Sequence, residues 1–258
     1  MIKINSKIGE LFPVDHTIVF FHAHSDDESF LSAGLINELI QLDRRCVVVY
    51  AATSIVLDQE KTVMRQQEAL KACSILGLTS ILYLNFCEPK YFGKSALRLI
   101  DQNVENISQN LYEALHDNVK EPIILISYDK NGGYGNPDHR VIHKVGRYFK
   151  KKYKNLVPFL YEITINREMV SKWLDGAKNR LDSKSIPKLS FWSTEFGLSS
   201  DEITHYYELT EDQLKLKYKA LTAHESQISV DEFPLSLSTS DFREVFGREF
   251  LKDTNGFI

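Results

Sequence analysis

Short apolar runs alternate with helix-like stretches through the first two thirds of the chain, and this alternation constrains the fold more than any other feature. The runs are rich in β-branched residues, as expected of strands covered on both faces. They are Thr17–Phe21, Cys46–Ala51, Ser80–Leu84, Pro122–Ser127 and Val157–Ile163. Helix-like segments lie between them at 30–36, 60–76, 97–115 and 138–151. This series predicts an α/β fold with a doubly wound, mostly parallel sheet and helices on both faces.

The pattern changes after the fifth run. The stretch 166–197 holds both tryptophans, many charges and no clear strand period, so we expect a variable excursion that covers a site. Ile203–Leu209 alternates like a half-exposed strand. The segment Thr210–Gln213 has the capping-box pattern, which predicts a helix running to about Gln227. The expected architecture is therefore a Rossmann-like sheet with a C-terminal strand–helix extension.

Composition excludes several classes of protein. The 31 basic and 35 acidic residues are spread along the chain and give a net charge of −4, so no basic patch indicates a nucleic-acid partner. No apolar run approaches the ~20 residues that span a bilayer, and the first seven residues lack the apolar region of a signal peptide. Three cysteines (Cys46, Cys73, Cys87) without a Cys-x-x-Cys motif are typical of buried, reduced thiols. We therefore expect a cytoplasmic protein without a membrane partner.

Two polar clusters follow the first and fourth apolar runs. The first, His24–Glu28, lies where a strand passes through a turn into a helix, and the second is Asn136–His139. Ligands bind at the carboxyl ends of strands in open α/β sheets. There, His24 and Asp27 can approach one metal ion, and His139 can complete the set from the second cluster.

Three such ligands leave Asp26 free for proton transfer. A catalytic zinc site has three nitrogen or oxygen ligands and one water, and the metal lowers the pKa of that water from 15.7 towards roughly 7. A neighbouring carboxylate can take the proton and then deliver it to a departing amine. The clusters therefore predict metal-assisted amide hydrolysis. Zn²⁺ is the expected metal, although Fe²⁺ suits two imidazoles and a carboxylate as well.

These clusters carry a family resemblance. His24–Glu28 resembles the Ala-His-Pro-Asp-Asp-Glu signature of the LmbE-like, or PIG-L, N-acetylglucosaminyl deacetylase family, which includes the mycothiol and bacillithiol pathway deacetylases. The segment 133–139 resembles that family's Gly-Tyr-Gly-His-Pro-Asp-His motif. Arg65–Glu68 is similar to its Arg-x-x-Glu helix, and 217–227 to its Lys-x-x-Ala-x-x-x-His-x-Ser-Gln helix. The matches extend from about residue 17 to residue 249.

The resemblance implies one LmbE-like deacetylase domain over residues 1–258. It implies His24, Asp27 and His139 as zinc ligands and Asp26 as the general base and acid. The family alignment also implies further site residues: Arg65 binds substrate, Tyr134 lies near the tetrahedral intermediate, and Asp138 orients a neighbouring ligand.

The chain departs from the family pattern at three positions. Asn136 stands where the family usually has a histidine, and an asparagine donates a neutral hydrogen bond but carries no proton. Glu88 lies near a position where an aspartate is common, and we expect it to substitute in binding substrate. Ser25 replaces a proline, which changes the stiffness of the turn and leaves the chemistry intact.

The leading hypothesis is a zinc-dependent deacetylase acting on an N-acetylated amino sugar or its conjugate, a small-molecule substrate. The nearest alternative is an amidase of the same family that cleaves a larger amide of such a conjugate. An alternative from another class is a catalytically weakened, metal-containing sugar-binding protein, which Asn136 would explain. A nucleotide-binding protein is disfavoured because the turn after the first strand lacks Gly-x-Gly-x-x-Gly. The sequence is compatible with a homo-oligomer.

Overall fold

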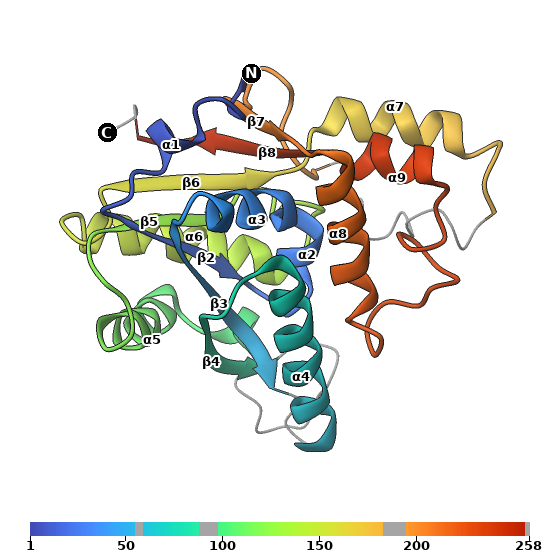
Figure 1. Cartoon of the computed structure of the whole chain (residues 1–258). Coiled ribbons are helices and arrows are strands. Elements are labelled where there is room, and N and C mark those ends of the chain that lie inside the picture. The colour runs from blue at the N-terminus through green and yellow to red at the C-terminus, as the bar shows by residue number, and fades with distance from the viewer. Residues whose placement is uncertain (55–58, 88–97, 183–194, 256–258) are drawn as a thin grey trace.

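The computed structural model describes residues 1–54, 59–87, 98–182 and 195–255 (Figure 1). Within these residues, eight strands form one sheet in the order β1-β7-β8-β6-β5-β2-β3-β4. The strands are β1 (Ile2–Lys3), β2 (Thr17–His22), β3 (Arg45–Ser54), β4 (Ile81–Cys87), β5 (Ile123–Tyr128), β6 (Phe159–Thr164), β7 (His205–Glu208) and β8 (Arg248–Asp253).

Helices connect most of these strands. In the described part of the chain they are α1 (Ile8–Leu11), α2 (Asp27–Leu31), α3 (Ala33–Gln41), α4 (Gln59–Leu76), α5 (Val104–His116), α6 (Pro137–Lys152), α7 (Arg167–Ala177), α8 (Glu211–Thr222) and α9 (Thr239–Phe246). A short 3₁₀ turn, η1, spans Leu99–Asp101.

The predicted doubly wound α/β fold is confirmed. Strands β4, β3, β2, β5 and β6 run parallel to one another. Helices α3 and α4 pack on one face of this sheet, and α5 and α6 pack on the other (Figure 1). Every residue of β2 and β5 is buried, which explains why their sequences are continuous apolar runs rather than alternating ones.

The other edge of the sheet is antiparallel. Strand β8 lies between β6 and β7 and runs antiparallel to both, while β1 joins the edge by pairing in parallel with β7. The sequence patterns predict β7 but neither β8 nor α9. Charged residues flank the apolar pair Phe250-Leu251 on both sides, so β8 lacks the long apolar run that marked the parallel strands.

Three predicted helices differ in their bounds. The segment expected at 30–36 is divided between α2, which ends at Leu31, and α3, which begins at Ala33. The helix expected from residue 97 begins at Val104, because Asn103 caps it by accepting a hydrogen bond from the Asn106 backbone N–H. The predicted capping box of Thr210 and Gln213 opens α8, but this helix ends at Thr222 instead of near residue 227.

The order of strands reverses at β2, which pairs with β3 on one side and with β5 on the other. The chain passes from β2 to β3 and β4 in one direction, and later from β5 to β6 in the other. Loops after β2 and β5 therefore leave the same edge of the sheet and diverge, which opens a crevice between them. The fold places the two polar clusters at this switch point.

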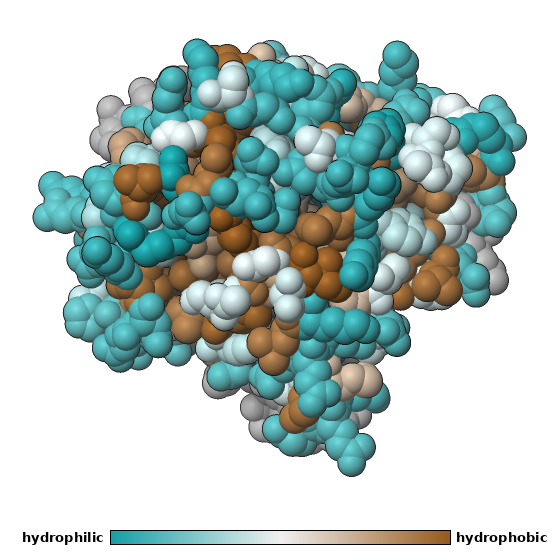
Figure 2. Space-filling view, in the orientation of Figure 1, coloured by the Kyte–Doolittle hydropathy of each residue, from teal (hydrophilic) through white to brown (hydrophobic). Residues whose placement is uncertain are grey.

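The described residues contain no helix that is long and apolar enough to cross a membrane. The face seen in Figure 2 is hydrophilic around its periphery, and hydrophobic side chains reach the surface mainly in its middle.

Candidate metal centre

The turn after β2 places the first cluster. Its backbone is strained at Asp26, which adopts φ 146°, a conformation that L side chains rarely adopt. Two hydrogen bonds hold this turn: the His24 backbone N–H donates to Asp27 Oδ2 at 2.9 Å, and the Asp26 N–H donates to Glu28 Oε2 at 3.1 Å. Strain that is held in this way is typical of functional sites.

The loop after β5 places the second cluster. The Asp129 carboxylate accepts hydrogen bonds from the backbone N–H groups of Asn131 and Gly133, which closes the loop. Gly132 adopts φ +70°, and a Cβ atom there would lie 2.7 Å from the carbonyl oxygen of Asn136. Asn136 then caps α6 through Oδ1, which accepts from the Asp138 N–H at 2.8 Å. As a result, His139 lies in the first turn of α6.

The two loops bring His24, Asp27 and His139 together. His139 Nε2 lies 3.2 Å from Asp27 Oδ2 and 3.4 Å from His24 Nδ1, and His24 Nδ1 lies 3.7 Å from the same Asp27 oxygen. All three residues are buried, and one ligand atom from each lies within 4.8 Å of the others. Residues more than a hundred positions apart therefore form one compact donor group.

This donor group fits a divalent transition metal. Ligands about 2.0–2.1 Å from a tetrahedral zinc are about 3.3–3.4 Å apart, and the three observed separations bracket that value. Asp27 Oδ1 is buried without a hydrogen-bond partner, a costly state for a carboxylate oxygen unless a cation or donor meets it. Two imidazoles and a carboxylate are also a usual zinc or iron ligand set.

Asp138 orients His24 in this group. His24 Nε2 lies 2.9 Å from Asp138 Oδ2, so the ring proton resides on Nε2 and the lone pair of Nδ1 faces Asp27 and His139. This buried carboxylate therefore selects the tautomer that can bind a metal.

Asp26 and Asp27 have opposite electrostatic environments. Burial raises the pKa of Asp26 to about 7, with the neighbouring Asp27 charge contributing. Burial also opposes ionisation of Asp27, but His139 and His24 outweigh it and hold the pKa of Asp27 below its usual range. Paired carboxylates with divergent pKa values are a hallmark of acid–base sites.

Tyr128, the last residue of β5, is part of the site although the sequence patterns do not single it out. Its hydroxyl donates to Asp27 Oδ2 at 2.7 Å and accepts from the Ala23 N–H at 2.9 Å. Its ring stacks on His139 with centroids 4.0 Å apart. Its position at the carboxyl end of the strand that leads to the second cluster could have identified Tyr128 as a site residue from the sequence.

Glu28 anchors a second buried network beside Asp26. Its carboxylate accepts hydrogen bonds from the Tyr50 hydroxyl at 2.7 Å and from the Ser29 hydroxyl at 2.5 Å, and His224 Nε2 lies 2.9 Å from it. In the sequence, His224 stands out only as part of the 217–227 segment that resembles a family helix. In the structure, it ties the segment after α8 to the turn that carries Asp26.

The remaining predicted residues differ in how closely they approach the group. The Tyr134 hydroxyl lies 3.4 Å from His139 Nε2. Arg65 is buried on α4 and lies near Asp26. Its positive charge partly offsets the rise in the pKa of Asp26 that burial causes. Asn136 lies at the start of α6, where its oxygen caps the helix. Glu88 lies outside the described residues.

A doubly wound sheet with a buried His–Asp–His group at its switch point defines a class of α/β enzymes with a metal site. Within this class, residues 19–149 match the model of the family PIG-L, described as GlcNAc-PI de-N-acetylase. The chain belongs to this family, and it is an N-deacetylase, a hydrolase.

Known proteins resemble the chain over most of its length. It is 24% identical over 260 residues to the 1D-myo-inositol 2-acetamido-2-deoxy-alpha-D-glucopyranoside deacetylase of Acidothermus cellulolyticus, covering 91% of this chain and 87% of that one. Among solved structures, the pseudoaglycone deacetylase Dbv21 has a TM-score of 0.64 at 13% identity, covering 93% of this chain and 97% of that one. The N,N'-diacetylchitobiose deacetylase from Pyrococcus horikoshii has a TM-score of 0.60 at 14% identity, covering 98% and 91%. The two structural likenesses concern the fold.

Proposed function

We propose that this protein is a zinc-dependent deacetylase that hydrolyses the acetamide of an N-acetylated amino sugar or its conjugate. The observation that carries the proposal is the convergence of His24, Asp27 and His139 within 4.8 Å, with Asp26 as the adjoining residue in the chain. Relatives whose names specify acetamido sugars support the substrate class.

In this proposal His24, Asp27 and His139 hold the metal. When bound, the metal supplies Lewis acidity, which lowers the pKa of water and polarises an amide carbonyl. Asp138 keeps the Nδ1 lone pair of His24 available, and Tyr128 holds the Asp27 carboxylate in place. The protein thus provides a rigid, buried set of donors.

Asp26 is the proposed general base and acid. Its carboxylate takes a proton from the attacking water and then delivers it to the nitrogen of the departing amine. The strained turn, together with the bond from the Asp26 N–H to Glu28, fixes where the carboxylate can reach. Acetate and the free amine are the products.

Further residues are proposed to contact the substrate. Tyr134 would donate to the oxyanion, and the position of its hydroxyl, 3.4 Å from His139 Nε2, supports this role. Asn136 adds a neutral donor at the start of α6, while Arg65 and Glu88 bind the sugar conjugate. Specificity would reside in the excursion at 166–197, of which the structure describes 166–182 and 195–197.

Metal content and acetate release from a panel of N-acetylated amino sugars test the proposal together. Asp26→Ala should retain the metal and lose about 10²–10⁴-fold in turnover, whereas His139→Ala should lose both metal and turnover. His116→Ala, on the exposed end of α5, is the matched control. Full activity in Asp26→Ala would contradict the assignment, and release of a larger acyl group instead of acetate would favour the amidase.

One observation favours a second candidate, a metal-containing sugar-binding protein with weakened catalysis. The Oδ1 atom of Asn136 is already engaged as the cap of α6, and the side chain cannot carry a proton. A protein that binds zinc and amino sugars without hydrolysing any of them would establish this candidate.

A further inference from the structure

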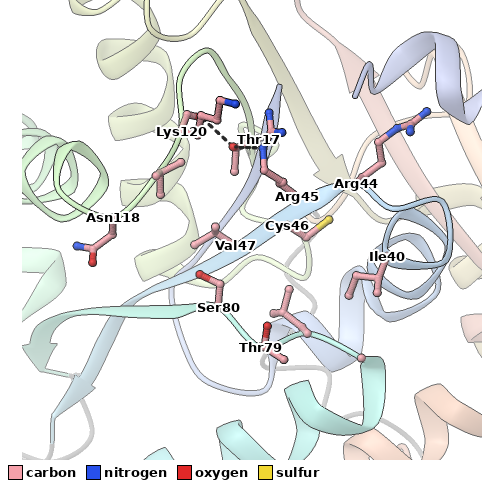
Figure 3. A pocket seen from close by; sticks show the side chains of 13 residues that line it. Thr17, Ile40, Arg44, Arg45, Cys46, Val47, Thr79, Ser80, Asn118 and Lys120 are labelled. Atoms are coloured by element: carbon pink, nitrogen blue, oxygen red, sulfur yellow. Dashed lines mark hydrogen bonds between the residues drawn. The ribbon is translucent and has the colours of Figure 1, made fainter. Parts of the chain in front are cut away.

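A cavity lies at the amino ends of the parallel strands, whereas the His–Asp–His group lies at their carboxyl ends. Its volume is about 410 Å³, and it is bounded by the first residues of β2 and β3 and by the loops that precede β4 and β5 (Figure 3). Thr17 lines this cavity at the start of β2, and His24 follows the end of the same strand, so roughly 20 Å separates the two sites. The cavity is therefore distinct from the proposed catalytic centre.

Arg45 contributes a positive charge to the lining of this cavity. Its Nε donates to Thr17 Oγ1 at 3.3 Å, which fixes the guanidinium near Lys120, since the Thr17 hydroxyl donates to the Lys120 carbonyl. Its Nη2 is buried and has no hydrogen-bond partner. This nitrogen has almost no accessible surface, so it does not face the cavity itself. The residue is nevertheless only half-buried, and within the described part of the chain no carboxylate forms an ion pair with it, so the positive charge of Arg45 can act on an anion in the cavity.

The described residues that line the cavity carry three cationic side chains and no acidic one. Arg44 is already partly engaged, because its Nε and Nη1 donate to the carbonyls of Phe12 and Leu42. Asp15 lies near enough to Arg45 to feel its charge, but it is exposed and pairs with His16. Arg45 and Lys120 are therefore the less engaged cations at this cavity.

The rest of the lining suits a hydroxylated ligand. Thr79 and Ser80 offer hydroxyls, and Figure 3 shows them apart from the end at which Arg45 and Lys120 lie. Asn118 donates to the Ala114 carbonyl, which leaves its amide oxygen as an acceptor. A space of this volume is larger than an inorganic anion and falls within the range of small-metabolite sites.

We propose that this cavity binds a small phosphorylated metabolite, a phosphate monoester of a polyol or sugar. Arg45 and Lys120 bind the phosphoryl group, because a guanidinium and an ammonium together match its charge and its several acceptor oxygens. Thr79, Ser80 and Asn118 contact the hydroxylated part. This site is independent of the proposed deacetylase chemistry.

Calorimetric titration of the full chain with glucose 6-phosphate, in the presence of EDTA, tests the proposal. Glucose 6-phosphate should bind saturably, inorganic phosphate should compete with it, and glucose should not bind. Bound ligand should also raise the thermal midpoint of unfolding. Because EDTA removes metal, the result does not depend on whether the His–Asp–His group functions.

Matched variants locate the site. Lys120→Gln should weaken binding about tenfold and Arg45→Gln by more, whereas Lys219→Gln, an exposed lysine on α8, should bind as the parent does. Lys120 is exposed, so its variant remains informative even if Arg45→Gln fails to fold. Absence of saturable binding, or equal affinity in the parent and Lys120→Gln, would overturn the proposal.

Discussion

The hydroxyl of Tyr128 donates a 2.7 Å hydrogen bond to Oδ2 of Asp27, so the last residue of β5 holds a carboxylate that begins α2. The two residues are 101 positions apart and both are fully buried. This bond links the two loops of the metal centre directly. Its strength should therefore govern how well the centre is organised before a metal arrives.

Tyr128→Phe tests this link. Removing the hydroxyl should lower metal affinity about 10–100-fold, as loss of an outer hydrogen bond to a ligand does, and it leaves the Ala23 N–H without its acceptor. Competition with a chromogenic chelator measures the affinity. Tyr153→Phe, which removes a hydroxyl near the end of α6, should bind metal normally. Unchanged affinity in Tyr128→Phe would show that Asp27 needs no such support.

Glu28→Gln tests how Asp26 is positioned. The substitution keeps the shape of the side chain but replaces one carboxylate oxygen with an NH₂ group. This new donor would face the groups that now bond to Glu28, which are the Asp26 N–H, the Tyr50 hydroxyl and His224 Nε2. The turn should shift, lowering kcat about 10–100-fold with KM nearly unchanged. Metal content should equal that of the parent.

Ser29→Ala is the control for this variant, because it removes a single donor to Glu28 and leaves the Asp26 N–H contact intact. Its kcat should stay within a few-fold of the parent. A Glu28→Gln protein with a raised KM and an unaltered kcat would contradict the positioning role.

The pair Lys217–Glu249 should dominate the stability of the C-terminal segment. The Lys217 ammonium lies 2.8 Å from Glu249 Oε1, both side chains are about 1% exposed, and the same carboxylate accepts from the Gly34 and Leu35 N–H groups. Lys217→Met leaves the buried Glu249 carboxylate without its cationic partner and should lower the free energy of unfolding by about 3–5 kcal/mol. Urea denaturation measures this loss.

The double variant Lys217→Met with Glu249→Gln completes a double-mutant cycle, which measures the interaction between the two charges. It removes both charges, so it should be less destabilised than the sum of the two single variants. Strict additivity would mean that the two charges do not interact.

Asp241 makes stability depend on acid pH. Its carboxylate accepts two 2.7 Å hydrogen bonds from Arg180 and one from the Trp173 indole, which joins α9 to the α7 segment. The Arg180 bonds, with help from Ser238 and Trp173, hold the pKa of Asp241 well below its usual range. The unfolded carboxyl titrates near pH 3.9, so the ionised form stabilises the fold above that pH. This stabilisation is lost as pH falls towards the lowered pKa.

Asp241→Asn should therefore be less stable than the parent at pH 7. The difference in the free energy of unfolding between the parent and Asp241→Asn should decrease steadily below about pH 4. Denaturant midpoints measured from pH 7 down to pH 2.5 check the trend, and Asp175→Asn, on the exposed end of α7, should show a smaller pH-dependent gap. A gap that widens in acid would contradict the assignment.

The parallel half of the fold could be predicted from the sequence because its signals are local. Continuous apolar runs mark strands that are buried on both faces, and the capping box at Thr210 marks the start of α8. Strand β8 escaped prediction because it is held by pairing with β6 and β7, neither of which adjoins it in sequence. Four of its own six residues, Arg248–Asp253, are charged.

Some features of the candidate site could likewise be predicted from the sequence, and others could not. The approach of His139 to His24 and Asp27 follows from the strand order, since both loops leave the same edge of a doubly wound sheet. The hydrogen bonds of Tyr128 and His224 depend instead on side-chain packing between elements remote in sequence. No spacing or periodicity in the sequence encodes such contacts.

The antiparallel edge also has a consequence for synthesis on the ribosome. Within the described residues, β1 meets the sheet only through β7, and β7 meets the parallel strands only through β8. Strand β1 can therefore be joined to the parallel strands only after residues 248–253 have been translated. Nascent chains stalled before this segment should bury the parallel layer and leave the segment Ile2–Lys3 open to proteases or chaperones.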